Sequence, residues 1–235
     1  IYWRVGRYHD ASEANIRAAE VDEEYIAQCN AQGFYPALYY PHNIHFLWAA
    51  STMEGRSSLS IESALKVAKY VGPEQIRQFP VVEFFHTVPL LSYVRFGKWE
   101  EILSYSMPAP EFKYSLGIYH YARGIALSAL GRKEDALKEL SYIKPLKDTQ
   151  EISNLVKAGQ PSLKLLEIAE KLLKGQIDFM EGNFESSIKS FKKAVALQDD
   201  LPYTEPPFWY YPTRQSLGRV LIEAGKFEEA EAVFK

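Results

Sequence analysis

Apolar residues recur at helical spacing along most of the chain. Short motifs that begin with glycine interrupt these apolar stretches. In each motif the glycine ends an apolar stretch, and a small or apolar residue follows five positions later. The glycines are Gly6, Gly55, Gly97, Gly131, Gly182 and Gly225, and the residues five positions later are Ala11, Ser60, Ile102, Ala136, Ser187 and Ala230. Glycine accepts the left-handed backbone that ends a helix, and a small residue one turn later lets two helices approach closely. The pattern predicts an all-α chain of about six helix-turn-helix units.

The glycines are separated by 49, 42, 34, 51 and 43 residues, so some units carry extra residues. Laying out each unit places the excess between one unit and the next, in 21–40, 71–79, 144–160 and 199–210. Proline is tolerated where a helix begins, and such prolines stand at Pro41, Pro80, Pro161 and Pro212. Pro89 falls inside a first helix and should kink it. We expect short additional helices within 21–33 and 144–160.

This pattern resembles the tetratricopeptide-repeat family, whose period of 34 residues equals the shortest glycine spacing. The residues that carry the resemblance are clearest in three copies: Tyr121-Ala122-Arg123-Gly124 with Gly131, Ala136 and Leu140; Gly175 with Gly182, Phe184, Phe191 and Ala194; and Leu217-Gly218 with Gly225, Phe227, Ala230 and Phe234. Earlier copies depart from the family, because Trp48 and Leu90 stand where it usually has a small residue. The resemblance covers almost the whole chain and implies a right-handed α-solenoid, with residues 1–235 forming a single repeat domain.

A second resemblance is narrower and rests on two segments, one in 39–56 and one in 205–215. The sequences of these two segments are similar to those of a group of bacterial tetratricopeptide-repeat proteins whose functions are mostly undefined. This resemblance indicates ancestry more than activity.

The family resemblance also implies a concave groove lined by the first helix of each unit. We expect this groove to accept an extended peptide or a helix of another protein. The residues that line it are found by counting back from each turn glycine. Its candidate residues are His42, His45, Thr52, Phe84, Thr87, Tyr121, Gln215 and Arg219. The leading functional hypothesis is therefore a non-catalytic scaffold or adaptor that holds a partner by a few aromatic and arginine anchors.

His42 and His45 are three residues apart, so a helix would project both from one face. Three interpretations stay open: hydrogen bonds near the start of the helix, contact with a partner, and a metal site that needs more ligands than these two. His86 and His120 are expected to pack inward as core histidines. The rival hypothesis is a protein that binds a small ligand or metal, or an enzyme, through such a histidine site. A third is a domain that only packs within a longer chain.

Two further features receive structural interpretations. The aromatic stretch 206–212 is expected to pack over neighbouring repeats as an extended linker, in preference to serving as a proline-type recognition segment. The charged residues of 131–139 and 182–193 are expected to form solvated surface.

Composition narrows the functional classes. With 27 Lys and Arg against 30 Asp and Glu, the net charge of −3 gives no reason to expect nucleic acid or an anionic membrane as partner. The single cysteine, Cys29, excludes an internal disulfide and is expected to be buried and inert. No apolar run is long enough to predict membrane insertion, and no motif predicts a cofactor or a catalytic residue. The start at Ile1 and the end at Lys235 suggest a piece of a longer chain, so export stays open, with the cytoplasm as the default location. The sequence does not indicate the oligomeric state.

Overall fold

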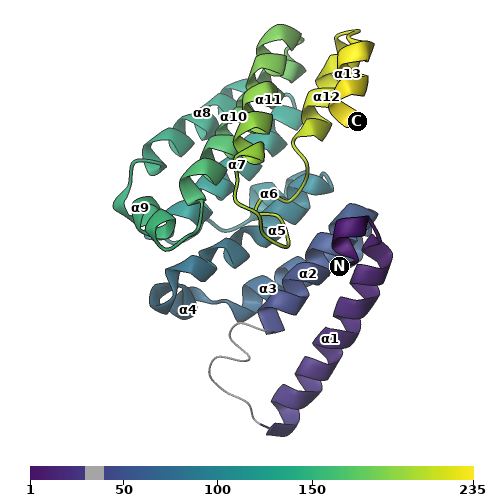
Figure 1. Cartoon of the computed structure of the whole chain (residues 1–235). Helices are drawn as coiled ribbons and strands as arrows, with labels where there is room; N and C mark the ends of the chain where they lie inside the picture. The colour runs from purple at the N-terminus through teal and green to yellow at the C-terminus, as the bar shows by residue number, and fades with distance from the viewer. Residues whose placement is uncertain (30–39) are drawn as a thin grey trace. The chain divides into compact units, whose positions relative to one another are not determined.

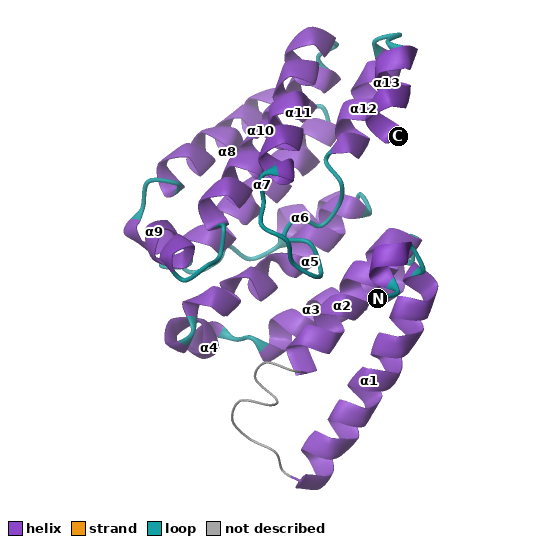
Figure 2. Cartoon of the chain, in the orientation of Figure 1, coloured by secondary structure: helices purple, strands orange, loops and turns teal. Residues whose placement is uncertain are grey.

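The computed structural model describes residues 1–29 and 40–235, and every regular element in these ranges is helical (Figure 2). The prediction of an all-α chain is confirmed for them. The remainder of the expected 21–40 connection, and the start of the 39–56 segment, lie outside the described residues. The chain divides into two compact units, Ile1–Phe96 and Gly97–Lys235, which are described separately. The expectation of a single repeat domain stays a prediction.

The first unit is a layer of antiparallel helices. Its elements are η1 (Trp3–Val5), α1 (Tyr8–Cys29), α2 (Tyr40–Glu54), α3 (Ser57–Tyr70), α4 (Pro73–Gln78), η3 (Pro80–Val82) and α5 (Glu83–Arg95). Helices α2 and α3 pack as a hairpin, α1 packs on α2, and α3 packs on α5. Apart from the short α4, each α-helix of this unit therefore packs against the next helix along the chain.

The second unit is also built of paired helices (Figure 1). Its elements are α6 (Trp99–Ser104), α7 (Lys113–Ala129), α8 (Lys133–Leu146), α9 (Gln150–Lys157), α10 (Ser162–Met180), α11 (Phe184–Asp199), α12 (Arg214–Glu223) and α13 (Phe227–Phe234). Three hairpins form, α7 with α8, α10 with α11, and α12 with α13. Successive hairpins are joined by contacts of α10 with α7 and α8, and of α12 with α11.

The predicted turns are confirmed at all six glycines, whose φ angles lie between 66° and 78°. At Gly131 the geometry is that of a Schellman cap. The Arg132 amide donates to the Leu127 carbonyl at 2.8 Å, and the Gly131 amide donates to the Ser128 carbonyl at 3.0 Å. A seventh turn of this kind, at Gly159 with φ of 90°, joins α9 to α10 and was not predicted.

The residues five positions after the six turn glycines are all buried, so the predicted close approach of paired helices is confirmed. Two glycines inside first helices show the repeat directly. A Cβ on Gly175 would meet the Phe191 ring, and a Cβ on Gly218 would meet the Phe234 ring. Each residue of the second pair lies 43 residues after its counterpart, which equals the spacing of the two turn glycines. The last two hairpins therefore pack in the same way.

The connections between hairpins differ in part from the prediction. Helix α1 continues to Cys29, beyond the expected start of the connection at Val21. The expected short helix within 144–160 is confirmed as α9, and α4 occupies the 71–79 connection. Pro89 lies inside α5 as predicted. Cys29 is exposed, not buried as predicted, because it is the last residue of α1, where a helix has few neighbours.

Candidate functional site

In the first unit, the predicted groove residues His45 and Phe84 are in contact. The His45 ring stacks on Trp48 with centroids 5.0 Å apart, and it meets the edges of Phe84 and Phe85 at 5.3 Å each. Only 7% of His45 is exposed. Burial, with a smaller effect of His42, lowers the pKa of His45 to about 3. The ring is therefore neutral at physiological pH and acts as an aromatic member of this cluster.

His42 lies on the accessible side of the same helix, with its ring 4.8 Å from that of Phe46. Partial burial lowers its pKa as well. Asn43 points away from both histidines, and its amide donates to the Asp22 carboxylate on α1 at 2.8 Å. His42 and the partly exposed Phe84 are thus the predicted groove residues that this part of the first unit presents.

Thr52 and Thr87 are buried, and their hydroxyls bond within the unit. Thr52 Oγ1 donates to the Trp48 carbonyl at 2.7 Å and shares a bond of the same length with the Ser60 hydroxyl. Thr87 Oγ1 donates to the Phe84 carbonyl at 2.7 Å. These threonines support the face from beneath and offer no surface to a partner.

In the second unit, Tyr121 is covered by the segment 200–213, which we call the strap. The strap leaves the end of α11, folds over α7 and enters α12 (Figure 1). The hydroxyls of Tyr121 and Tyr210 are 2.9 Å apart, and the ring of Trp209 meets that of Tyr121 edge-on at 5.5 Å. Tyr121 is 1% exposed and Trp209 is 2% exposed. A partner could touch Tyr121 only by displacing the strap.

Side chains of the flanking helices hold the strap in place. The Gln198 side-chain oxygen accepts from the backbone amide and hydroxyl of Thr213 at 2.7 and 2.8 Å, and its amide donates to the Tyr211 carbonyl at 3.0 Å. Arg214 makes a two-pronged ion pair with Asp199 at 2.6 and 2.8 Å. The prediction that 206–212 packs as a linker is confirmed.

Gln215 and Arg219 lie on α12, one turn apart on the same face. The Arg219 guanidinium stands 4.4 Å from the centre of the Phe179 ring and donates to the Gln176 side-chain oxygen at 2.5 Å. Gln176 and Phe179 come from α10, so the first helices of two successive hairpins meet here. Partial burial lowers the pKa of Arg219. The two groups that hold this guanidinium are uncharged.

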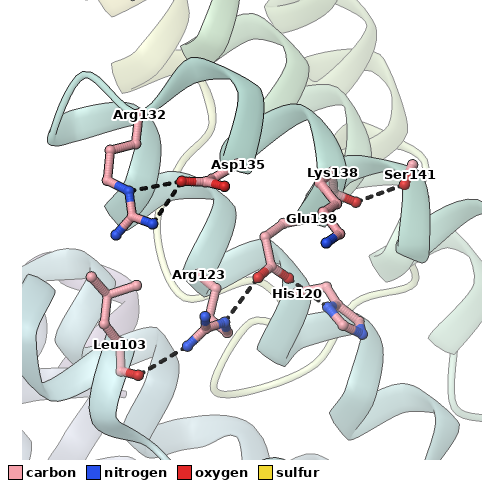
Figure 3. A network of polar contacts seen from close by, with 8 residues as sticks. All are labelled: Leu103, His120, Arg123, Arg132, Asp135, Lys138, Glu139 and Ser141. Carbon is pink, nitrogen blue, oxygen red and sulfur yellow. Dashed lines mark hydrogen bonds and ion pairs between the residues drawn. The ribbon is translucent and has the colours of Figure 1, made fainter.

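A polar network joins α6, α7 and α8 in the second unit (Figure 3). The Glu139 carboxylate bonds His120 Nδ1 at 2.6 Å and accepts from Arg123 Nε at 2.9 Å, while Arg123 Nη1 donates to the Leu103 carbonyl at 2.9 Å. Burial opposes ionisation of Glu139, but the bonds from His120 and Arg123 outweigh it and lower its pKa. The network clamps three helices together.

Sequence reasoning missed this network. Glu139 belongs to the stretch 131–139 that was expected to be solvated, and this expectation is wrong for it, since its side chain is only 12% exposed. His120 was expected to be a core residue; its side chain is 13% exposed and is bonded to Glu139 at the edge of the core. His86, the other expected core histidine, is half-buried on α5. The sequence held one signal for this network: Glu139 and Tyr142 are three residues apart, so a helix places both on one face. In the structure both contact His120.

The described residues contain no group of three or more His, Cys, Asp or Glu side chains arranged to hold a metal ion. A metal at His42 and His45 therefore has no further ligand of these types within 1–29 and 40–235. In the same ranges, no helix combines the length and apolar composition that a membrane span requires. No protein-family model, curated protein or solved structure matches this chain.

Proposed function

We propose that the chain is a right-handed solenoid of tetratricopeptide-like hairpins that serves as a non-catalytic adaptor and binds a peptide or helix of another protein. Three features support the solenoid: the repeated glycine turns, the buried small residues after them, and the contacts between successive hairpins. Leu166 lies 49 residues after Gly117 and Leu173 lies 49 residues after Gly124, and each leucine packs over its glycine. First helices α7 and α10 therefore run parallel, which repeats one helix face along the second unit.

The observation that carries the proposal is Arg219 on this repeated face. Its guanidinium is held by Phe179 and Gln176, and within residues 1–29 and 40–235 it forms no ion pair. An arginine held in place over an aromatic ring loses little side-chain freedom on binding. Arginine and aromatic residues are enriched among the few residues that dominate binding energy at interfaces. Of the eight predicted residues, the proposal keeps Gln215 and Arg219 as partner contacts of the second unit, and His42 and Phe84 as separate candidate contacts of the first. His45, Thr52, Thr87 and Tyr121 become supporting residues.

Site-specific photo-crosslinking tests the proposal. A benzophenone amino acid at Gln215 would sample the groove, and the same group at the exposed Lys189 of α11 would sample a surface outside it. We expect a protein that crosslinks at position 215 and not at 189. Replacing Arg219 by Ala should lower this crosslink about fivefold or more, since an anchor of this kind is worth over about 1 kcal/mol. Equal crosslinking at both positions, or no effect of R219A, would contradict the adaptor function.

A further inference from the structure

A pocket of about 490 Å³ lies in the second unit, and none of the predicted groove residues lines it. Its lining residues come from α10, from the C-terminal half of α11, and from the residues that directly follow α8 and α11. The lining residues are Lys147, Glu167, Lys171, Lys193, Ala196, Leu197 and Asp200. Sites for small molecules usually have volumes of about 300–1,000 Å³. The pocket has the size of a binding site and no role in the proposed adaptor function.

Most of the charges around this pocket are compensated. Glu170 forms ion pairs with Lys147 and with Lys171, the latter at 2.6 Å. Burial disfavours the Glu170 carboxylate, but the two lysines outweigh burial and lower its pKa. Lys164 binds Asp200 through both the side chain and the backbone carbonyl. These pairs hold the rim of the pocket.

Two charges are left over, and they have opposite signs. Glu167 on α10 and Lys193 on α11 both line the pocket, and neither forms an ion pair or side-chain hydrogen bond within the described part of the chain. Ala196 and Leu197 supply apolar surface on the α11 wall. The pocket thus offers one acceptor for a cation, one donor for an anion, and an apolar contact.

We propose that this pocket binds a small zwitterionic molecule of the peptide class. The free amine of the ligand pairs with Glu167, its carboxylate pairs with Lys193, and an apolar side chain lies on Ala196 and Leu197. The pocket is open to solvent at the exposed Lys193 and Ala196, and Glu167 is partly buried. Hydrogen bonds between oppositely charged groups are stronger than those between neutral groups. Only a ligand that carries both signs satisfies both walls. The site is independent of the groove, so it stands or falls separately from the adaptor function.

Calorimetry with three matched peptides tests the proposal on the whole chain. Leucyl-leucine carries both charges, N-acetyl-leucyl-leucine lacks the cation, and leucyl-leucine amide lacks the anion. We expect leucyl-leucine to bind at millimolar concentration or better. Each blocked peptide should bind about tenfold more weakly, a change of about 1.4 kcal/mol, because it loses a hydrogen bond to a charged group. No binding of leucyl-leucine, or equal binding of all three peptides, would overturn the proposal.

Charge-removing variants assign the contacts. E167Q should abolish the preference for the free amine and keep the preference for the free carboxylate, whereas K193Q should do the opposite. K189Q, on the same helix but outside the pocket, should bind all three peptides like the wild type. All three positions are at least partly accessible, so circular dichroism should show an unchanged fold. Preferences that survive both E167Q and K193Q would place the peptide elsewhere and contradict the site.

Discussion

At the scale of single residues, the surroundings of a polar side chain decide what it does in this protein. His45 is enclosed by aromatic rings, which leave it neutral. His120 is of the same residue type but faces Glu139, and it belongs to a charged network. Both residues occupy predicted first helices, so helix position alone does not distinguish them.

His45 should make the stability of the protein depend on pH. Its pKa is about 3 in the folded chain against an ordinary value of 6.5, so only the unfolded chain takes up this proton as the pH falls below 6.5. The free energy of unfolding then falls by about 1.4 kcal/mol per pH unit, or about 2 kcal/mol between pH 7 and pH 5. Urea denaturation at the two pH values measures this loss.

The control is H45Q, which cannot titrate. Whatever the stability of H45Q at pH 7, its free energy of unfolding should fall by about 2 kcal/mol less than that of the wild type between pH 7 and pH 5. Burial lowers the pKa of His42 and His86 too, so their contributions have the same sign and remain in both proteins. An identical pH dependence of the two proteins would show that His45 is not held neutral.

Replacing Glu139 by Gln should destabilise the protein by about 1–3 kcal/mol at pH 7, because Arg123 and His120 lose a charged partner in a half-buried site. D135N is the matched control, since Asp135 pairs with Arg132 on the exposed side of the same helix and such pairs are worth under about 1 kcal/mol. Thermal or urea denaturation compares the two. Because the Glu139 pKa is lowered, its stabilisation should disappear as the pH falls below about 4.5. Equal costs for E139Q and D135N would show that the network contributes little.

At the scale of the helical element, the close approach of paired helices depends on glycine. A Cβ at Gly175 would lie 2.6 Å from Phe191, whose ring is 1% exposed and has no room to move. At Gly218 the opposing ring is that of Phe234, which is 55% exposed. The same sequence feature therefore meets a rigid neighbour in one hairpin and a movable one in the other.

This difference predicts unequal effects of the same substitution. G175A should destabilise the protein by up to about 2 kcal/mol, since overpacking costs about 1–3 kcal/mol and the gain in helix propensity returns about 1. G218A should be close to neutral, because Phe234 can turn toward solvent. Denaturation curves of both variants measure the contrast. A G218A variant as unstable as G175A would mean that Phe234 is held as firmly as Phe191.

At the scale of the whole molecule, the strap is the main departure from a simple stack of hairpins. It brings Tyr210 against Tyr121, 89 residues earlier in the chain. Trp209 and Pro206 are buried in it, whereas Tyr203 is 70% exposed. The strap fills the part of the predicted groove face that Tyr121 occupies, and the accessible part of that face in the second unit is near Arg219.

If the strap belongs to the core, W209A should destabilise the protein by about 3–5 kcal/mol, the cost of removing a large buried side chain. Y203A, in the same segment, should change stability by less than about 0.5 kcal/mol. Chemical denaturation followed by circular dichroism measures both. A W209A variant as stable as Y203A would instead favour a detachable recognition segment.

The sequence by itself determined the turns, the buried small residues beside them and the all-helical class, because each depends on local chemistry. Glycine takes a left-handed backbone, and a short side chain admits a neighbouring helix, wherever the hairpin lies. Tertiary structure alone decided which predicted residues are accessible. The burial of Tyr121 under the strap and the pairing of His120 with Glu139 depend on segments 89 and 19 residues away, respectively. Helical periodicity records which face of a helix is covered, but it does not record which segment covers it.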